Sequence, residues 1–328
     1  MATLARVDAI SDRTLSRLVK WGVVALVVLV ATFGVIYYLG RHVNTGPTLA
    51  DRQVASAEQA LRDAPKNVQT RLRLAATYQA VGRLDDAMAQ YDEVLRAVPG
   101  NRTALLAKGQ LVLNAGDAAQ AKTLFTKITT DGSKEEFSLA DPNLGAAHYF
   151  LAKIAGDSSD WKTALTEIKA ALAVDRTDAD SLFLQGQLQG KAGDEAGAVA
   201  SYAAALSFVP TGWCEPYQAM QASYTSLGKS AFAEYAGAMA AFCQKDPEGA
   251  TQRLTALADG DAKLPAMLGL ALIAETQSQR DQAVGWYQKV LKVDPRNSTA
   301  LTGIGRLTGT DSDGHGASAA PTTQAKAS

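Results

Sequence analysis

Three histidines and two cysteines are the side chains of this sequence best suited to metal binding or acid–base chemistry. The histidines, His42, His148 and His315, stand far apart and lack the short spacings of metal-ligand motifs. No G-x-x-x-x-G-K-S/T phosphate-binding loop is present. The acidic pairs at 85–86 and 135–136 fall at expected turns and loops, and a helix start favours carboxylates without any catalytic role. The sequence therefore predicts no catalytic residue, no metal, no cofactor and no enzymatic activity.

The composition indicates a folded, helical protein without a nucleic-acid footprint. Lys and Arg number 32 against 33 Asp and Glu, and hydrophobic residues make up 47% of the chain. Nucleic-acid binding requires clustered basic charge, which this balance does not indicate. Alanine is abundant and favours helices that pack closely. We expect neither a nucleic acid nor a small-molecule substrate among the partners.

One long apolar segment, residues 21–39, contains no charged residue. As a helix it would span roughly 28 Å, close to the hydrocarbon thickness of a bilayer. Trp21 at its start and Tyr37 and Tyr38 near its end suit the two membrane interfaces. A cleaved signal peptide is the alternative, but its apolar core is shorter and a small-residue cleavage site follows it closely. We predict a retained transmembrane helix.

The basic residues around this segment are unevenly distributed. Those before it are Arg6, Arg13, Arg17 and Lys20, and those after it are Arg41 and the more distant Arg52. The positive-inside rule places residues 1–20 in the cytoplasm and the chain after residue 39 outside it. In a Gram-negative bacterium this location would be the periplasm.

A frame of small and large residues recurs along residues 50–308. Its copies are Ala75-Tyr78-Gly82-Ala87-Tyr91-Pro99, Gly109-Val112-Gly116-Ala121-Phe125, Ala152-Ala155-Ala164-Ile168, Gly186-Gly193-Ala198-Tyr202-Pro210, Tyr224-Gly228-Ala233 and Ala271-Ala274-Ala283-Tyr287-Pro295. Ala87 and Ala121 are 34 residues apart, as are Ala164 and Ala198. Small residues let two helices cross closely, a large residue of the second helix fills the space, and proline ends that helix.

This frame resembles the tetratricopeptide repeat (TPR). The resemblance implies an all-α protein, a right-handed α-solenoid of about six repeats, here preceded by one transmembrane helix. Proteins of this kind bind other proteins, and the anchored arrangement is similar to that of bacterial envelope TPR assembly factors.

The repeats define the remaining segments. Residues 40–49 form a linker, and residues 49–67 are expected to form a lone second helix. Insertions fall near 131–142 and 248–263, the latter as an extra helix without a partner in the repeat frame. Each insertion is either exposed decoration or a partner contact. A capping helix follows the sixth repeat, and residues 309–328, rich in Gly, Ser, Thr and Ala, are predicted to be disordered.

The two cysteines lie in the fifth repeat. Cys214 would begin its first helix and Cys243 would lie near the end of the second. Antiparallel helices bring these ends together, within the Cα separation that a disulfide needs. Such a bond would persist only in an oxidising compartment, in agreement with the predicted topology. Two buried thiols are the alternative.

In TPR proteins the first helix of each repeat lines a concave groove that holds a peptide or a partner helix. Carried over to this chain, the groove lining would be Leu72, Arg73, Gln79, Leu106, Gln110, Asn114, Tyr149, Lys153, Phe183, Gln187, Lys191 and Gln218. Amide, aromatic and isolated basic side chains suit an extended segment. The alternative is a solvated or self-packed face. The Lys/Asn set that clamps a terminal carboxylate is not reproduced in any pair of repeats, so we do not predict that ligand.

These features predict a membrane-anchored, extracytoplasmic TPR scaffold or adaptor. Its partners would be other proteins, chiefly membrane or envelope proteins during assembly of a complex. Two alternatives remain open. One is a stoichiometric structural subunit of a large membrane complex, and the other is a chaperone-like factor for secreted clients such as apocytochromes c.

Overall fold

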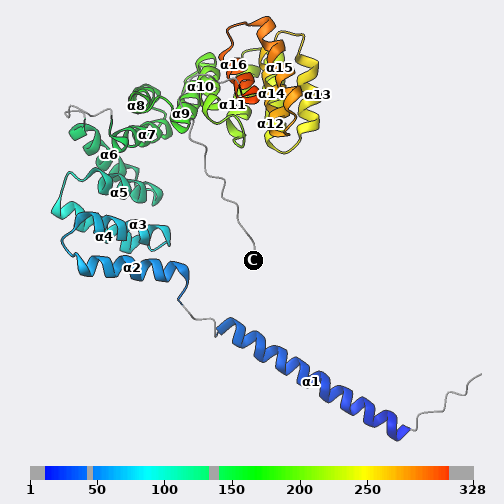
Figure 1. The fold of residues 1–328 in the computed structure, drawn as a ribbon. Coiled ribbons are helices and arrows are strands. Elements are labelled where there is room, and N and C mark those ends of the chain that lie inside the picture. The colour runs from blue at the N-terminus through cyan, green and yellow to red at the C-terminus, as the bar shows by residue number, and fades with distance from the viewer. Residues whose placement is uncertain (1–11, 43–46, 133–139, 310–328) are drawn as a thin grey trace, which may run out of the picture. The chain divides into compact units, whose positions relative to one another are not determined.

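The computed structural model describes residues 12–42, 47–132 and 140–309, and the regular elements in these ranges are α-helices (Figure 1). They are α1 (Asp12–His42), α2 (Leu49–Asp63), α3 (Val68–Ala80), α4 (Leu84–Ala97), α5 (Arg102–Asn114), α6 (Ala118–Gly132), α7 (Pro142–Asp157), α8 (Trp161–Val174), α9 (Ala179–Lys191), α10 (Glu195–Phe208), α11 (Glu215–Ser226), α12 (Ser230–Cys243), α13 (Pro247–Leu257), α14 (Lys263–Thr276), α15 (Arg280–Val293) and α16 (Ser298–Thr308). The predicted all-α fold is confirmed. Of the predicted features, most of the loop near 131–142, His315 and nearly all of the tail lie outside the described residues.

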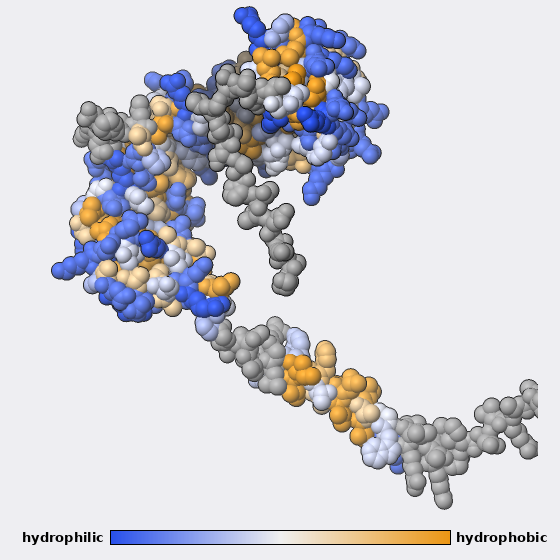
Figure 2. Space-filling view, in the orientation of Figure 1, coloured by the Kyte–Doolittle hydropathy of each residue, from blue (hydrophilic) through white to orange (hydrophobic). Residues whose placement is uncertain are grey.

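Helix α1 carries the predicted apolar segment. The stretch Lys20–Tyr38 is 19 residues long, and none of it is buried. Figure 2 shows apolar side chains along the visible face of this helix. Its length and composition would let it cross a membrane, although a signal sequence would meet the same criteria.

The chain divides into two units, residues 1–90 and 91–328. In the first, α2 begins with a capping box, in which Thr48 and Asp51 each accept a hydrogen bond from the other's backbone N–H. Helix α2 packs against α3, and the Tyr78 hydroxyl donates to Glu58 at 2.8 Å. The predicted lone helix therefore packs against the first helix of the first repeat.

In the second unit, each helix packs against the next, and small residues face large ones. A Cβ added at Gly109 would lie 2.5 Å from the Phe125 ring, and one at Gly186 would lie 2.5 Å from the Tyr202 ring. Both rings are buried. The predicted exchange of a small residue for a large one at helix crossings is therefore present in these pairs.

The turn between the two helices of a pair adopts a left-handed backbone at one residue. Glycine occupies it in four pairs, at Gly82, Gly116, Gly193 and Gly228. Ser159 and Ser278 take this position in the third and sixth pairs, with φ of 59° and 60°. The frame therefore lacks its glycine in those two repeats because a strained serine replaces it.

Helix α13 changes the register of the array. Up to α11, helices two apart that contact each other are odd-numbered: α5 with α7, α7 with α9, and α9 with α11. Beyond α11, α12 contacts α14. Ala250 and Leu254 of α13 are fully buried, and α13 packs against both α12 and α14. Helix α13 is therefore more than surface decoration: it buries one apolar face between its neighbours and leaves the other face exposed.

A disulfide ties the ends of α11 and α12. Cys214 immediately precedes α11, Cys243 ends α12, and their Cα atoms are 5.5 Å apart. The bond therefore closes the helix pair at the ends where the sequence analysis places the two cysteines.

Candidate functional site

In the first unit, one predicted groove residue is a core residue. Leu72 is 7% exposed and is one of the buried residues of α3, so its side chain contributes little accessible surface to a groove. Arg73 is exposed and lines a cleft of about 710 Å³ between α2 and α3, together with Arg52 and Leu49. Gln79 is half-buried. The correction at Leu72 follows from helix periodicity, because two adjacent residues, Leu72 and Arg73, cannot face the same side of a helix.

In the second unit, the predicted groove residues have mixed environments. Those that are half-buried are Leu106, Gln110, Tyr149 and Phe183, and those that are exposed are Asn114, Lys153, Gln187, Lys191 and Gln218. The Phe183 ring contacts the Tyr202 ring at 5.6 Å and the Trp213 ring at 5.0 Å between centroids. The Phe183 ring therefore already has two aromatic partners, one in α10 and one in the segment between α10 and α11.

Tyr149 lines a small pocket of about 270 Å³, together with Val174, Asp178 and Asp180. Burial, followed by the charges of Asp180 and Asp178, raises the pKa of Tyr149. The Tyr149 hydroxyl therefore keeps its proton to a higher pH than the hydroxyl of an exposed tyrosine does.

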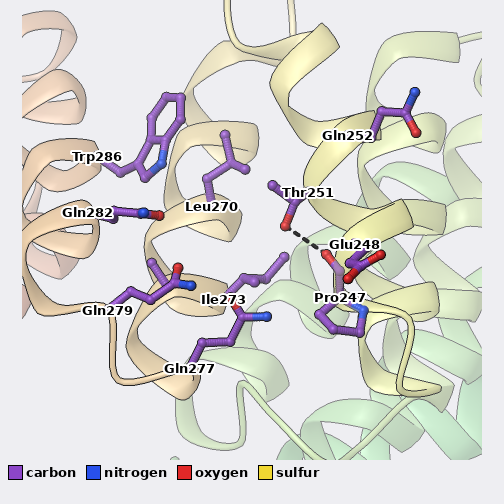
Figure 3. Close-up of a pocket in the computed structure, with 11 residues that line it drawn as sticks. Pro247, Glu248, Thr251, Gln252, Leu270, Ile273, Gln277, Gln279, Gln282 and Trp286 are labelled. Carbon is purple, nitrogen blue, oxygen red and sulfur yellow. Dashed lines mark hydrogen bonds between the residues drawn. The ribbon is translucent and has the colours of Figure 1, made fainter.

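A larger cleft lies over α14, between α13 and α15 (Figure 3). It measures about 490 Å³. Its floor is apolar: Leu270 and Ile273 of α14 are each 2% exposed. Trp286 of α15 forms part of one wall, and Lys289 lies over the indole ring with its Nζ 3.7 Å from the centroid. Pro247 and Thr251 of α13 stand opposite, and the Thr251 hydroxyl donates a hydrogen bond of 2.7 Å to the Pro247 carbonyl.

The rim of this cleft is made of amides. Its glutamines are Gln252, Gln277, Gln279 and Gln282, all of them exposed. Gln279 occupies the N-cap position of α15 without making a side-chain capping hydrogen bond. Each amide offers two N–H donors and a carbonyl acceptor. The cleft therefore combines an apolar floor with open hydrogen-bonding groups.

None of the groove residues predicted from the sequence lines this cleft. Those residues were assigned by repeat position and ended at Gln218, before the extra helix that builds one wall. The available signal was the glutamine cluster around the turn between the helices of the sixth repeat, at Gln277, Gln279 and Gln282. Because the packing of α13 could not be predicted, however, that cluster indicates only an ordinary polar turn.

A second cavity of about 430 Å³ lies along α12, α14 and α16. Its charged groups are already paired: Glu275 accepts from the Tyr287 hydroxyl at 2.6 Å and from Arg306 at 2.7 Å. Burial, followed by the bond to Glu275, raises the pKa of Tyr287. This cavity therefore offers a ligand fewer open polar groups than the glutamine-rimmed cleft.

Several ionisable residues of the described ranges join one helix to another. His148 Nδ1 lies 2.6 Å from a Glu167 oxygen, which joins α7 to α8. Arg102 donates to Asp141 at 2.6 Å and joins the start of α5 to the start of α7. Among the described residues, no three His, Cys, Asp or Glu side chains are arranged to hold a metal ion.

Two models of the tetratricopeptide repeat match the chain, over residues 49–111 and 149–212. The chain carries tetratricopeptide repeats. These matches cover α2 to α5 and α7 to α10, the regular pairs that precede the register change at α13. The TPR array is therefore assigned by its sequence frame and by its helix pairs together.

Several solved structures are similar to the chain. YrrB, described as a TPR protein with an unusual peptide-binding site, is 20% identical, with 61% of this chain and 97% of YrrB covered at a TM-score of 0.47. The C-terminal part of a TPR protein from Cytophaga hutchinsonii is 12% identical, with 83% and 99% covered at a TM-score of 0.48. MamA is 20% identical, with 54% and 92% covered at 0.46. No curated protein matches the sequence.

Proposed function

We propose that this protein is a membrane-tethered TPR scaffold that binds other proteins outside the cytoplasm during assembly of a membrane or envelope complex. One observation carries the proposal: the TPR array is preceded by a helix whose 19-residue apolar stretch is wholly exposed. An exposed apolar surface of this length requires an apolar environment, and a bilayer provides one. Tethering would confine the repeats to the membrane surface and raise the effective concentration of membrane partners.

Two further observations support the location outside the cytoplasm. Basic residues are concentrated before the apolar stretch, which favours a cytoplasmic N-terminus. The Cys214–Cys243 disulfide on the far side of that stretch suits an oxidising compartment. The distribution of basic residues and the disulfide are independent observations, and both favour a location of the repeats outside the cytoplasm.

The test is purification of the full-length protein from native membranes in mild detergent, with the co-purifying chains quantified. A recurrent set of membrane or envelope proteins supports the scaffold. A fixed one-to-one complement identifies a structural subunit, whereas many substoichiometric secreted chains identify a client-handling factor. Recovery of a soluble chain that lacks residues 1–39 would show a cleaved signal sequence and contradict the tether.

Topology is tested separately in intact cells. A membrane-impermeant maleimide is applied after reduction with an impermeant phosphine, and labelling of Cys214 and Cys243 is measured. Labelling in intact cells places the repeats outside the cytoplasm. Labelling only after lysis would reverse the proposed orientation.

A further inference from the structure

The end of the first unit at which α2 begins carries two exposed leucines. Leu49, the first residue of α2, is 72% exposed, the highest value among the large apolar residues of α2 to α16. Helix α3 runs back along α2, so that Ala80 at its end and Leu49 line the same cleft. Leu84 begins α4 directly after this turn and is 50% exposed. The two leucines therefore lie at one end of the unit, and Figure 2 shows apolar surface at the start of α2.

Two arginines flank the cleft of about 710 Å³ that opens at this end. Arg52 lies in the first turn of α2, and Arg73 lies seven residues before Ala80, about 10 Å along α3. Within the described part of the chain, neither guanidinium group forms an ion pair or a hydrogen bond. Both cations are therefore available to an anion from outside the protein.

The acidic side chains at the same end are already engaged. Asp51 accepts a hydrogen bond from the Thr48 backbone N–H at 2.9 Å, and Asp86 accepts one from Arg83 at 2.6 Å. Asp85 lies in the first turn of α4, where the helix dipole favours a carboxylate. These carboxylates therefore do not compete for the two arginines of the cleft.

The length of the chain keeps this end close to the membrane that α1 would cross. The apolar stretch of α1 ends at Tyr38, and α1 itself ends at His42. Six residues separate His42 from Leu49. Fully extended, this segment reaches about 25 Å, and a flexible segment of its length has a typical end-to-end distance of about 15 Å. The start of α2 therefore meets the bilayer surface at a high effective concentration.

We propose that the leucine end of the first unit, made of Leu49, Leu84, Arg52 and Arg73, rests on an anionic phospholipid surface of the membrane that α1 spans. The proposal rests on the proposed function in taking α1 as a membrane tether. Leu49 lies at the boundary between headgroups and acyl chains, where its exposed surface leaves water. The two guanidinium groups donate hydrogen bonds to lipid phosphates, whose geometry they match. This contact holds the first repeat against the membrane.

The test uses the full-length chain in lipid nanodiscs of phosphatidylcholine and phosphatidylglycerol. Because the two native cysteines form a disulfide, Leu49→Cys supplies a single thiol for labelling with the fluorophore NBD. Lipids with a nitroxide near the headgroup quench NBD on contact. We expect about a twofold loss of emission at position 49, since an interfacial side chain lies about 5–10 Å deep. The control is Leu301→Cys on α16, where the native leucine is 51% exposed and no loss is expected.

Variants of the arginines test the lipid charge. In the labelled Leu49→Cys chain, the quenching gives the ratio of docked to free molecules. Arg52→Gln combined with Arg73→Gln should lower this ratio about tenfold and remove its dependence on phosphatidylglycerol. Arg176→Gln combined with Arg296→Gln removes the same charge from two exposed turn residues of the second unit, and should change the ratio less than about twofold.

Three results would overturn the proposal. They are absence of quenching at position 49, equal quenching at positions 49 and 301, and equal ratios in the two double arginine variants. A blue-shifted NBD emission without quenching would also overturn it, because a second copy of the chain would then cover this end instead of lipid. Failure of the chain to enter nanodiscs would contradict the tether itself, so the two failures are distinguishable. Circular dichroism checks that every variant keeps its helices.

Discussion

Helices α1 and α14 are both strongly apolar, yet their side chains have opposite surroundings. Seven residues of α14 are buried among α12, α13 and α15, including Leu270 and Ile273. In α1, none of the stretch Lys20–Tyr38 is buried, and Leu29 at its centre is 65% exposed. Apolar composition shows only that a helix needs to leave water. Length and neighbouring helices determine whether a protein core or a bilayer receives it.

Length separates the two helices at once. Helix α14 has 14 residues and extends about 21 Å, too short for a bilayer, whereas the apolar stretch of α1 alone extends roughly 28 Å. Packing detail separates them further. A Cβ added at Gly269 of α14 would lie 2.8 Å from the Met239 sulfur, whereas one at Gly34 of α1 meets nothing within 4 Å.

The largest expected effect comes from placing a charge in each helix. Leu270→Arg buries an unpaired cation in the core, and we expect it to cost more than about 4 kcal/mol and to abolish the unfolding transition of the C-terminal repeats. Leu29→Arg should instead reduce membrane retention, with an insertion cost of about 3 kcal/mol, and leave that transition unchanged. Circular dichroism melts and membrane fractionation measure the two effects. Unfolding of the repeats in the Leu29→Arg variant would contradict the expectation that the two helices respond differently to a charge.

The disulfide links the ends of α11 and α12 covalently, whereas α1 contains no cysteine. Replacement of both Cys214 and Cys243 by alanine should lower the free energy of unfolding by about 3–4 kcal/mol, since the bond closes a loop with a sequence separation of 29. Denaturant unfolding followed by Trp fluorescence measures the loss. Dithiothreitol should shift the wild-type midpoint but not that of the variant. An unchanged wild-type midpoint under reduction would contradict this prediction.

Alkaline pH tests burial in the repeats directly. Burial, followed by the charge of Glu195, raises the pKa of Tyr202 to about 12. The unfolded chain loses this proton near pH 10, so the contribution is constant below pH 10 and stability falls as pH rises from 10 to 12. After allowance for solvent screening the loss is about 1–2 kcal/mol. Tyr202→Phe should match the wild type at pH 8 and be more stable at pH 11. Parallel pH profiles would refute the effect.

The last comparison is between two glycines. A methyl group at Gly186 collides with the Tyr202 ring, so Gly186→Ala should destabilise the repeats by about 1–3 kcal/mol. Gly34→Ala meets nothing within 4 Å and should leave the unfolding of the repeats unchanged. Urea titration of both variants in the same detergent gives the comparison. Equal midpoints would show that the crossing at Gly186 relaxes freely.

Much of the fold could be predicted because local residue patterns encode it. The frame with Gly109 and Phe125, or with Gly186 and Tyr202, specifies which side chains meet at a helix crossing. The glycine at a left-handed turn marks the boundary between two helices. Such rules act within about 34 residues, so they are visible without knowledge of distant contacts.

The candidate site was less predictable because it depends on where helices pack. Leu72 was assigned to a groove by repeat position, but its direction from α3 buries it. Phe183 was predicted to line the groove, with a self-packed face as the alternative, and the rings of Trp213 and Tyr202 lie against it. The glutamines 277, 279 and 282 were visible in the sequence, but their opposite wall comes from α13, whose position was not encoded by the repeat frame.

By itself, the sequence determined that this protein is an all-α TPR array, that one apolar segment precedes it, and that two cysteines stand at the ends of one helix pair. Periodicity, length and residue size carry that information, and each acts locally. Only the tertiary structure decided that α13 buries one apolar face between α12 and α14, that the contacts between alternate helices shift from odd to even helices there, and that a glutamine-rimmed cleft opens over α14. The physical reason is that an apolar helix face, such as the one of α13 that carries Leu254, can pack against many surfaces. Its partners are determined only when the neighbouring helices, here α12 and α14, have packed.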